Sequence, residues 1–133
     1  MIPKLKIRMI KVILKIVLTA SLFLMFSCEN KSTLPDPLEA GWKGQAVCEV
    51  LQEDNTIRVL KCTFAPGVGH ERHEHAPHFG YTLKGSTFKI TDDKGTREVK
   101  VSTGYDFYKG ETSVHEVQNI GDSTAVFLIV EPK

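Results

Sequence analysis

The chain has 133 residues, with 17 basic and 16 acidic side chains and a formal net charge of +1. All five charged residues among residues 1–28 are basic, so the remainder carries 12 basic and 16 acidic side chains and a net charge of −4. This composition offers no basic stripe for phosphate backbones, and the chain has no glycine-rich phosphate-binding loop. Nucleic acid is therefore excluded as an expected partner, and the length allows one small domain.

Residues 1–28 have the composition of an export signal. A basic leader is followed by an apolar stretch at residues 16–26 and then by Cys28. Eleven residues rise only about 17 Å as a helix, whereas the hydrocarbon core of a membrane is roughly 30 Å thick. We therefore expect a signal peptide and an exported protein rather than a stable membrane-spanning helix.

The segment Met25–Cys28 resembles the lipobox of bacterial lipoproteins, in which the cysteine is acylated and becomes the first mature residue. The resemblance implies lipidation of Cys28 and a protein anchored to a membrane of the bacterial cell envelope, on its periplasmic or surface side. The alternatives are ordinary cleavage or an uncleaved anchor. Residues 29–44, which include Pro35 and Pro37, are expected to form a tether between the anchor and the folded domain.

Residues 45–133 are expected to form one all-β domain, since strand-like runs alternate with turn residues and helical periodicity is lacking. The expected strands are Ala46–Glu53, Ile57–Phe64, Glu71–His75, Phe79–Lys84, Thr87–Thr91, Arg97–Val101, Asp106–Tyr108, Ser113–Asn119 and Thr124–Glu131. Many short, regularly spaced strands indicate a closed barrel or a sandwich. The apolar run at residues 125–130 indicates a strand that is buried on both faces.

Cys48 and Cys62 lie on the first two expected strands, on either side of a turn near Asn55. A hairpin centred there places the two cysteines opposite each other, close enough for a disulfide. Directly opposed strand positions strain such a bridge, however, and a cysteine is often simply a small buried apolar residue. The sequence leaves both alternatives open.

Four of the five histidines lie between residues 70 and 78, and the fifth is His115 in a separate expected strand. In a strand, His73 and His75 point to the same face about 7 Å apart. Neutral imidazole is the commonest metal-binding side chain. The pattern predicts a divalent metal ion held by His73, His75 and His115, with His70 at the rim.

Two motifs resemble those of the cupins, which are small antiparallel jelly-roll barrels with a metal site inside. The matching residues are Pro66, Gly67, His73, His75 and Gly85 in the first motif, and Gly104, His115 and Asn119 in the second. The resemblance covers roughly residues 45–131 and implies a single jelly-roll barrel. A barrel of this size has a limited core and cupins commonly pair through outer strands, so we also expect a homodimer.

The chain departs from the cupin pattern at the usual acidic ligand, whose place falls near His78. Strand alternation alone would turn Tyr81 inward and His78 outward. Pro77 interrupts the strand, and a kink there would instead turn His78, Gly80 and Thr82 inward. The site then has either a fourth histidine ligand or three histidines with open positions for water and substrate.

Neutral imidazole ligands suit Fe, Zn, Ni or Cu, and suit Mn less well. Such an ion lowers the pKa of bound water or of a substrate hydroxyl or thiol. The resemblance implies a metal-dependent enzyme of the dioxygenase or isomerase type that acts on a small molecule. The alternative is a noncatalytic lipoprotein that binds or senses a small ligand or a metal. Tyr81 is the candidate acid–base group, Asn119 is expected to be structural, and a hydrolytic triad is disfavoured.

Overall fold

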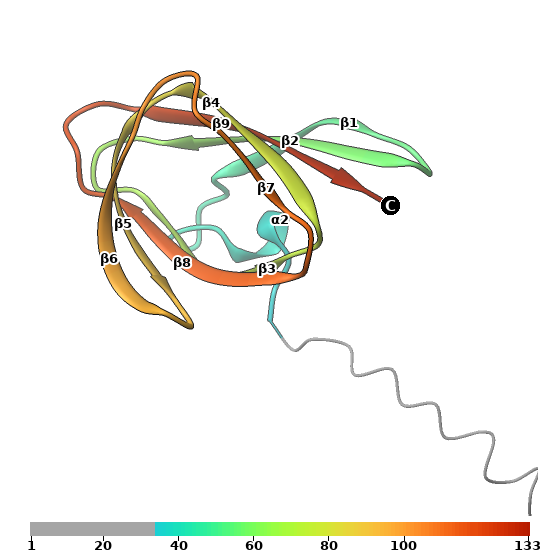
Figure 1. Cartoon of the computed structure of the whole chain (residues 1–133), viewed down its shortest axis with the longest axis horizontal. Coiled ribbons are helices and arrows are strands. Elements are labelled where there is room, and N and C mark those ends of the chain that lie inside the picture. The colour runs from blue at the N-terminus through green and yellow to red at the C-terminus, as the bar shows by residue number, and fades with distance from the viewer. Residues whose placement is uncertain (1–33) are drawn as a thin grey trace, which may run out of the picture. The chain divides into compact units, whose positions relative to one another are not determined.

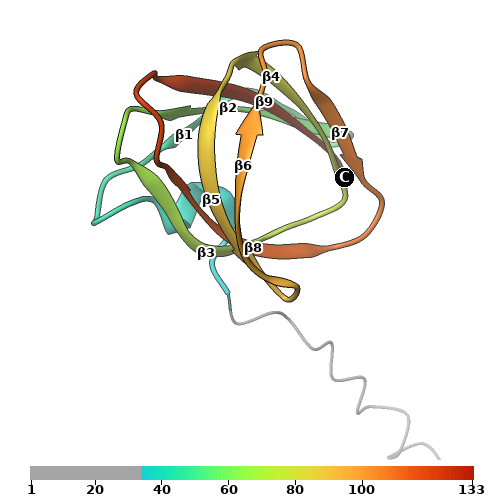
Figure 2. The same cartoon turned by 60° about the vertical axis from the view of Figure 1, so that its left-hand side comes forward.

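Nine strands and one short helix make up residues 34–133, the part of the chain that this computed structural model describes. They are α2 (Pro37–Ala40), β1 (Cys48–Glu53), β2 (Ile57–Phe64), β3 (Gly69–His75), β4 (His78–Lys84), β5 (Ser86–Asp92), β6 (Gly95–Val101), β7 (Asp106–Lys109), β8 (Ser113–Asn119) and β9 (Ala125–Pro132). One sheet has the strand order β1-β2-β9-β4-β7 and the other β3-β8-β5-β6, and the strands pair antiparallel. The two sheets curve around a common interior as a jelly-roll barrel (Figures 1 and 2).

The all-β expectation is confirmed, and each expected strand is present. β3 begins at Gly69 and β6 at Gly95, two residues before the expected starts, because pairing with the neighbouring strands continues into the turns. β9 was expected to be buried on both faces, but its outer face is not fully covered. On that face Val126, Leu128 and Val130 are only half-buried.

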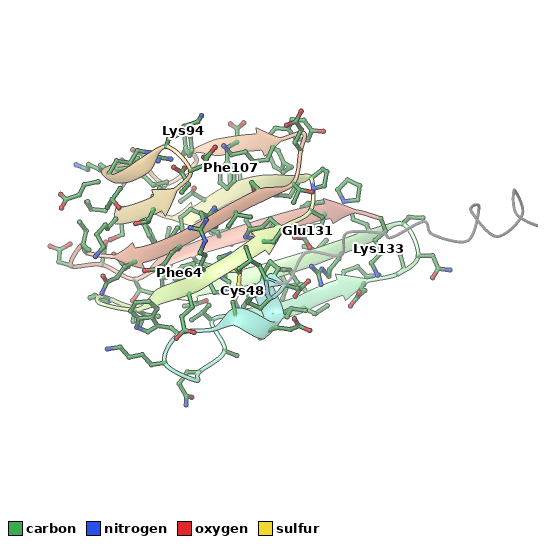
Figure 3. All side chains as sticks on the ribbon, turned by 90° about the horizontal axis from the view of Figure 1, so that it is seen from below. Cys48, Phe64, Lys94, Phe107, Glu131 and Lys133 are labelled. Atoms are coloured by element: carbon green, nitrogen blue, oxygen red, sulfur yellow. A yellow bond between two sulfur atoms is a disulfide. The ribbon has the colours of Figure 1, made fainter. Side chains whose placement is uncertain are left out.

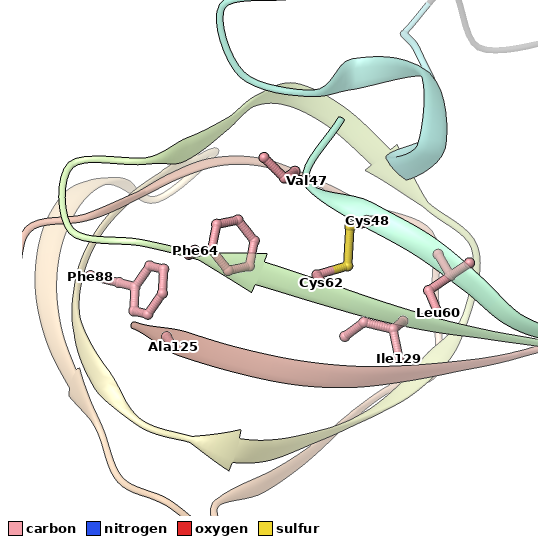
Figure 4. Close-up of a cluster of buried hydrophobic side chains, with 8 residues drawn as sticks. All are labelled: Val47, Cys48, Leu60, Cys62, Phe64, Phe88, Ala125 and Ile129. Atoms are coloured by element: carbon pink, nitrogen blue, oxygen red, sulfur yellow. A yellow bond between two sulfur atoms is a disulfide. The ribbon is translucent and has the colours of Figure 1, made fainter. Parts of the chain in front are cut away.

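The apolar core lies mainly on the inner faces of β2 and β9 (Figure 4). Its buried residues are Val47, Cys48, Leu60, Cys62, Phe64, Phe88, Ala125 and Ile129. The rings of Phe64, Phe88 and the half-buried Phe127 meet edge to face, with centroids 5.5 to 6.0 Å apart. Burying one such side chain stabilises the fold by roughly 1.5–3 kcal/mol.

Cys48 and Cys62 form a disulfide, which decides the alternative that the sequence left open. The two residues face each other in the β1–β2 ladder, with an S–S distance of 2.02 Å and a Cα–Cα distance of 4.0 Å. Both are buried within the apolar core. The bridge fixes β1, an outer strand of its sheet, to β2.

The segment expected to form a tether instead pairs with the barrel over residues 35–41, which we call the N-terminal strap. The backbone N–H of Glu74 donates to the carbonyl of Pro35 at 3.0 Å, and that of Glu71 donates to Gly41 at 2.9 Å. β3 is an outer strand of its sheet, so the strap covers groups that would otherwise be unpaired. The folded unit therefore begins before residue 45.

The strap contains α2, which explains why its prolines do not mark a flexible linker. Asp36 is the N-cap, and its carboxylate accepts a hydrogen bond from the backbone N–H of Leu38 at 2.8 Å. The N-cap backbone in turn donates to the Glu39 side chain, which completes a capping box. Pro37 lies in the first turn, where a missing N–H costs nothing.

The predicted signal peptide and the lipidation of Cys28 fall on residues that lie outside the described part of the chain. A membrane-spanning apolar helix was not found among residues 34–133. The predicted envelope location and membrane anchor remain expectations.

Candidate metal centre

The β3–β8 ladder brings the predicted histidine ligands together. His73 lies directly opposite His115, and His75 lies directly opposite Ser113, so the four side chains share the inner face of the sheet. One donor nitrogen from each of His73, His75 and His115 lies within 4.8 Å of the others. His73 and His75 are buried and His115 is half-buried. This three-histidine cluster is able to bind a metal ion.

Hydrogen bonds at the outer edges of two rings orient their inner nitrogens. The Nδ1 of His73 lies 2.6 Å from the carbonyl oxygen of Glu71, and the Nδ1 of His75 lies 3.1 Å from Glu131 Oε1. Both partners are acceptors, so each Nδ1 carries the proton and each Nε2 of the neutral rings has a lone pair. The two Nε2 atoms are 2.9 Å apart.

Facing lone pairs repel each other unless a cation lies between them. Metal–imidazole bonds are about 2.0–2.1 Å long, so two nitrogens bound to one ion at roughly a right angle lie about 3 Å apart. The observed Nε2 separation of 2.9 Å matches that arrangement. The donor set therefore fits a divalent metal ion.

His78 points into the barrel, as the kinked alternative requires. His78, Gly80 and Thr82 are buried, whereas Phe79 and Tyr81 are exposed. His78 faces inward because the chain leaves one sheet after β3 and enters the other at β4. The inward–outward alternation of side chains in β3 therefore does not continue into β4.

The ring of His78 lies beside the cluster, at a centroid distance of 4.6 Å from that of His75. Its Nδ1 donates to the carbonyl of Ala76 at 2.8 Å, which leaves a lone pair on Nε2. Its donor atoms are not among those that lie within 4.8 Å of one another. A fourth ligand at His78 therefore stays a prediction.

Tyr81 is not brought to the histidines, because it alternates with the inward residues of β4 and is 38% exposed. The geometry does not support its expected acid–base role. The ring of Phe107 lies on the inner side of β4, against Gly80. It occupies the space that a side chain at position 80 would need. This ring is 5.9 Å from that of His78 and lines the candidate site with an apolar surface.

His70 was expected at the rim, but it is buried, with 2% of its surface exposed. Its ring stacks on that of His73 at a centroid distance of 3.7 Å, and its Nε2 donates to the carbonyl of Pro37 at 2.9 Å. A spacing of three residues would put His70 and His73 on opposite faces of a regular strand. The ladder shifts register between them, and this irregularity turns both inward.

A buried charged group, absent from the sequence-based prediction, lies behind the cluster. Glu131 is 2% exposed and accepts hydrogen bonds from His75 and from Arg58 Nε, the latter at 2.6 Å. Arg58 also ion-pairs with Asp36. The sequence could have predicted this burial of Glu131. Residues two apart in a strand share a face, and Glu131 follows the inward-facing Ile129 by two positions in β9.

Burial keeps the rings of His70, His73, His78 and His115 neutral at physiological pH. It lowers the pKa of His73 to about 2, of His115 to about 3 and of His70 to about 4, and the neighbouring imidazoles reinforce the effect. The pKa of His78 is lowered for the same reason. Neutral rings have free lone pairs, so an incoming cation displaces no proton from them.

The pKa of Glu131 shows two opposing effects. Burial alone would raise it, but the hydrogen bonds from His75 and Arg58 outweigh burial, and the pKa is lowered. The carboxylate is therefore ionised at neutral pH. It supplies negative charge behind His75 without joining the imidazole cluster.

Two buried hydroxyl groups, Ser113 Oγ and Thr82 Oγ1, have no hydrogen-bond partner among the described residues. Ser113 is opposite His75 and two residues from His115, on the same strand face. The Ser113 hydroxyl is thus placed to form a hydrogen bond with a small molecule bound at the histidine cluster. Thr82 lies four residues along β4 from His78.

Asn119 is a structural residue, as expected. Its amide donates to the carbonyls of Phe64 and Ser123, both at 2.8 Å, and its carbonyl oxygen accepts from Ser86 Oγ at 2.7 Å. It is fully buried and joins the end of β8 to β2 and β5. Its hydrogen-bonding capacity is used in holding the barrel together.

Comparison with known proteins supports this architecture. Residues 60–131 match the family model for the cupin domain. No curated protein matches the sequence. Among solved structures, a cupin domain from Bordetella pertussis Tohama I has a TM-score of 0.61 at 20% identity, with 65% of this chain and 92% of that chain covered.

Two further solved structures carry names of enzymes. The polyketide cyclase RemF from Streptomyces resistomycificus has a TM-score of 0.56 at 19% identity, covering 81% of this chain and 80% of that chain. A predicted oxalate decarboxylase from Thermotoga maritima has a TM-score of 0.50 at 18% identity, covering 62% and 76%. At these identities the likeness shows the fold alone. Because the family model spans more than half of the chain, the protein belongs to the cupin family.

Proposed function

We propose that this protein is a metal-dependent enzyme of the dioxygenase or isomerase type that acts on a small molecule. His73, His75 and His115 are the proposed metal ligands, and His78 is an adjacent fourth. The observation that carries the proposal is the pair of Nε2 atoms that face each other at 2.9 Å, with a third imidazole donor within 4.8 Å.

The residues around the cluster support a ligand-binding site. Three neutral ligands leave a divalent ion its full charge, and Fe, Zn, Ni, Cu or Mn are all compatible with imidazole to differing degrees. When bound, such an ion binds and polarises a substrate oxygen or lowers the pKa of a bound water. Phe107 offers an apolar surface beside His78, and the Ser113 hydroxyl offers a hydrogen bond.

The noncatalytic alternative also has an observation in its favour. The expected acid–base group, Tyr81, lies on the outer side of β4. An enzyme would then rely on the metal ion and its bound water for proton transfer, whereas a protein that only binds a metal or a small ligand needs no acid–base group. Product formation in the presence of bound metal separates the two functions.

We also propose that the protein is an exported lipoprotein of the bacterial cell envelope, anchored through Cys28. The buried Cys48–Cys62 disulfide supports an oxidising compartment. Growth with a palmitate analogue should label the wild type and leave Cys28→Ala unlabelled. Equal labelling of the two chains would overturn the anchor.

A homodimer is proposed as well, because exposed aromatic side chains gather on the outer side of β4 and β7. Phe79 and Tyr108 are direct neighbours there, with 40% and 69% of their surfaces exposed, and Tyr81 lies two residues along. Light scattering should give twice the chain mass for the wild type and the single mass for Phe79→Glu. A monomeric wild type would exclude the dimer.

The experiment that tests the metal site is elemental analysis of the full chain purified without a histidine tag. We expect about one metal ion per chain in the wild type and none in His73→Ala or His115→Ala. The matched control is His70→Phe, which keeps an aromatic ring on His73 but alters no proposed ligand. A wild-type protein that contains no metal and takes up none would contradict the proposal.

A further inference from the structure

The N-terminal strap contacts the histidines through two neighbouring residues. Asp36 ion-pairs with Arg58, and the carbonyl of Pro37 accepts a hydrogen bond from His70. The strap also adds backbone hydrogen bonds to β3, the strand that carries His73 and His75. A segment that precedes the first strand therefore lies directly behind the candidate metal centre.

The first contact leads from the surface to His75 through three charged side chains. Asp36 is 37% exposed at its side chain, Arg58 16% and Glu131 3%, so the path runs progressively inward. Arg58 and Glu131 are paired across β2 and β9, and Arg58 Nε donates to Glu131 Oε2 at 2.6 Å. The other oxygen of Glu131 accepts from His75 Nδ1 at 3.1 Å. Figure 3 labels Glu131 near the C-terminal end of β9, close to Lys133.

The second contact leads to His73. Pro37 holds the ring of His70, and that ring stacks on His73 at a centroid distance of 3.7 Å. The two paths begin at adjacent residues of the strap and end at the two histidines whose Nε2 atoms face each other. The N-terminal strap thus restrains the rings of both His73 and His75.

We propose that Asp36, Arg58 and Glu131 form a positioning relay that fixes the tautomer of His75, so that its Nε2 lone pair faces the metal. The relay deepens the proposed function and rests on it where metal affinity is concerned. Its effect on the tautomer does not depend on a bound metal. Partners of this kind typically alter metal affinity about 10–100-fold.

A purely structural role is the competing explanation of these buried charges. A buried ion pair is weak support for stability, because well-packed apolar residues of similar volume often do as well or better. The relay instead meets a specific requirement of the site. Only an acceptor at Glu131 keeps the proton on His75 Nδ1 and the lone pair on Nε2.

Glu131→Gln tests the relay with little change of shape. Arg58 requires an acceptor and will take the amide oxygen, which turns the amide NH₂ toward His75. The NH₂ donates to Nδ1, so the ring proton moves to Nε2 and the lone pair is lost from the cluster. Nitrogen-15 NMR of the metal-free full chain should show His75 protonated at Nδ1 in the wild type and at Nε2 in the variant.

Cobalt binding provides the second readout, measured by competition with a chelator on the full chain. We expect Glu131→Gln to weaken Co²⁺ binding about 10–100-fold. Asp36→Asn keeps the N-cap but loses the charge that faces Arg58, and we expect Co²⁺ binding to weaken about two- to fivefold. In the Glu131→Gln background, Asp36→Asn should have no further effect, because the path is already broken.

The matched control is Glu49→Gln, which removes another ion pair between a carboxylate and a cation. Glu49 ion-pairs with Lys61 across the β1–β2 ladder, and its side chain is exposed. Its Co²⁺ affinity should equal that of the wild type. A loss equal to that of Glu131→Gln would assign the effect to general destabilisation and overturn the relay.

The remaining outcomes separate the relay from the proposed function. If the wild type binds no Co²⁺ but Glu131→Gln shifts the His75 proton, the metal proposal fails and the relay stands. If Co²⁺ binds both proteins equally and the His75 proton stays on Nδ1, the relay is overturned. Should Glu131→Gln fail to fold, Asp36→Asn decides, since an unchanged Co²⁺ affinity together with an unchanged tautomer would refute the relay.

Discussion

The two ends of the β2–β9 ladder hold opposite kinds of interior. At one end Phe64 faces Ala125, and the aromatic cluster with Phe88 is closed to solvent. At the other end Arg58 faces Glu131, which contacts the ring of His75, and the rings of His73 and His115 lie beside it. Figure 3 labels Phe64 and Glu131 at separate places along the barrel. The first end stabilises the fold by excluding water, whereas the second buries polar groups that gain most from a bound cation.

The largest effect is expected at the apolar end. Phe64→Ala removes a ring that contacts both Phe88 and Phe127, and we expect a loss of about 3–5 kcal/mol in the free energy of unfolding. Urea denaturation of the metal-free, oxidised protein measures it. A loss below about 1 kcal/mol would mean that the aromatic cluster is not the main source of stability.

The imidazole end should respond to metal where the apolar end does not. At a free metal concentration of 100 times the dissociation constant, binding stabilises the wild type by about 2.7 kcal/mol. His115→Ala should lose this gain and keep the fold, because its ring is half-buried and outside the apolar core. Thermal unfolding with and without metal measures the gain. An equal gain in His115→Ala would exclude His115 as a ligand.

Acid should destabilise the metal-free protein through its imidazole end. Because burial lowers the pKa of His70 to about 4, the unfolded chain binds a proton below about pH 6.5 that the folded chain does not. Stability is therefore complete above pH 6.5 and falls between pH 6.5 and 4, by about 1.4 kcal/mol per pH unit for each such histidine. His70→Phe should reduce the slope by that amount. An unchanged slope in urea denaturation across this range would contradict the assignment.

The smallest effect is expected at Ser113, whose hydroxyl is buried without a partner among residues 34–133. Ser113→Ala should leave stability and Co²⁺ affinity unchanged, since no hydrogen bond within the described chain is lost. Azide binding to the Co²⁺-loaded protein should weaken about 3–10-fold, the effect of one hydrogen bond. Thr82→Val serves as the control, and an equal loss there would remove the special role of Ser113.

The strands and the three-histidine cluster followed from local pattern and motif spacing. Alternation within β3 put His73 and His75 on one face, and antiparallel pairing with β8 added His115. The cupin resemblance also anticipated the family, because its two motifs lie on the strands that meet at the cluster. These features depend on neighbours in sequence or on one strand pairing.

The positions of His70, Tyr81 and Glu131 depended on features that local pattern does not carry. A register shift inside β3 turned His70 inward, and the change of sheet after His75 reset the alternation so that Tyr81 faced outward. Glu131 lies 56 residues from His75 in sequence, and their contact arises only when the two sheets close around the interior. Long-range closure, rather than strand formation, was the missing information.

The central claim is that three imidazoles share one cation, and anomalous X-ray diffraction from crystals loaded with zinc tests it most directly. We expect a single anomalous peak about 2.0–2.1 Å from a ring nitrogen of each of His73, His75 and His115. A crystal that shows no peak among these rings, or a peak bound elsewhere on the chain, would contradict it.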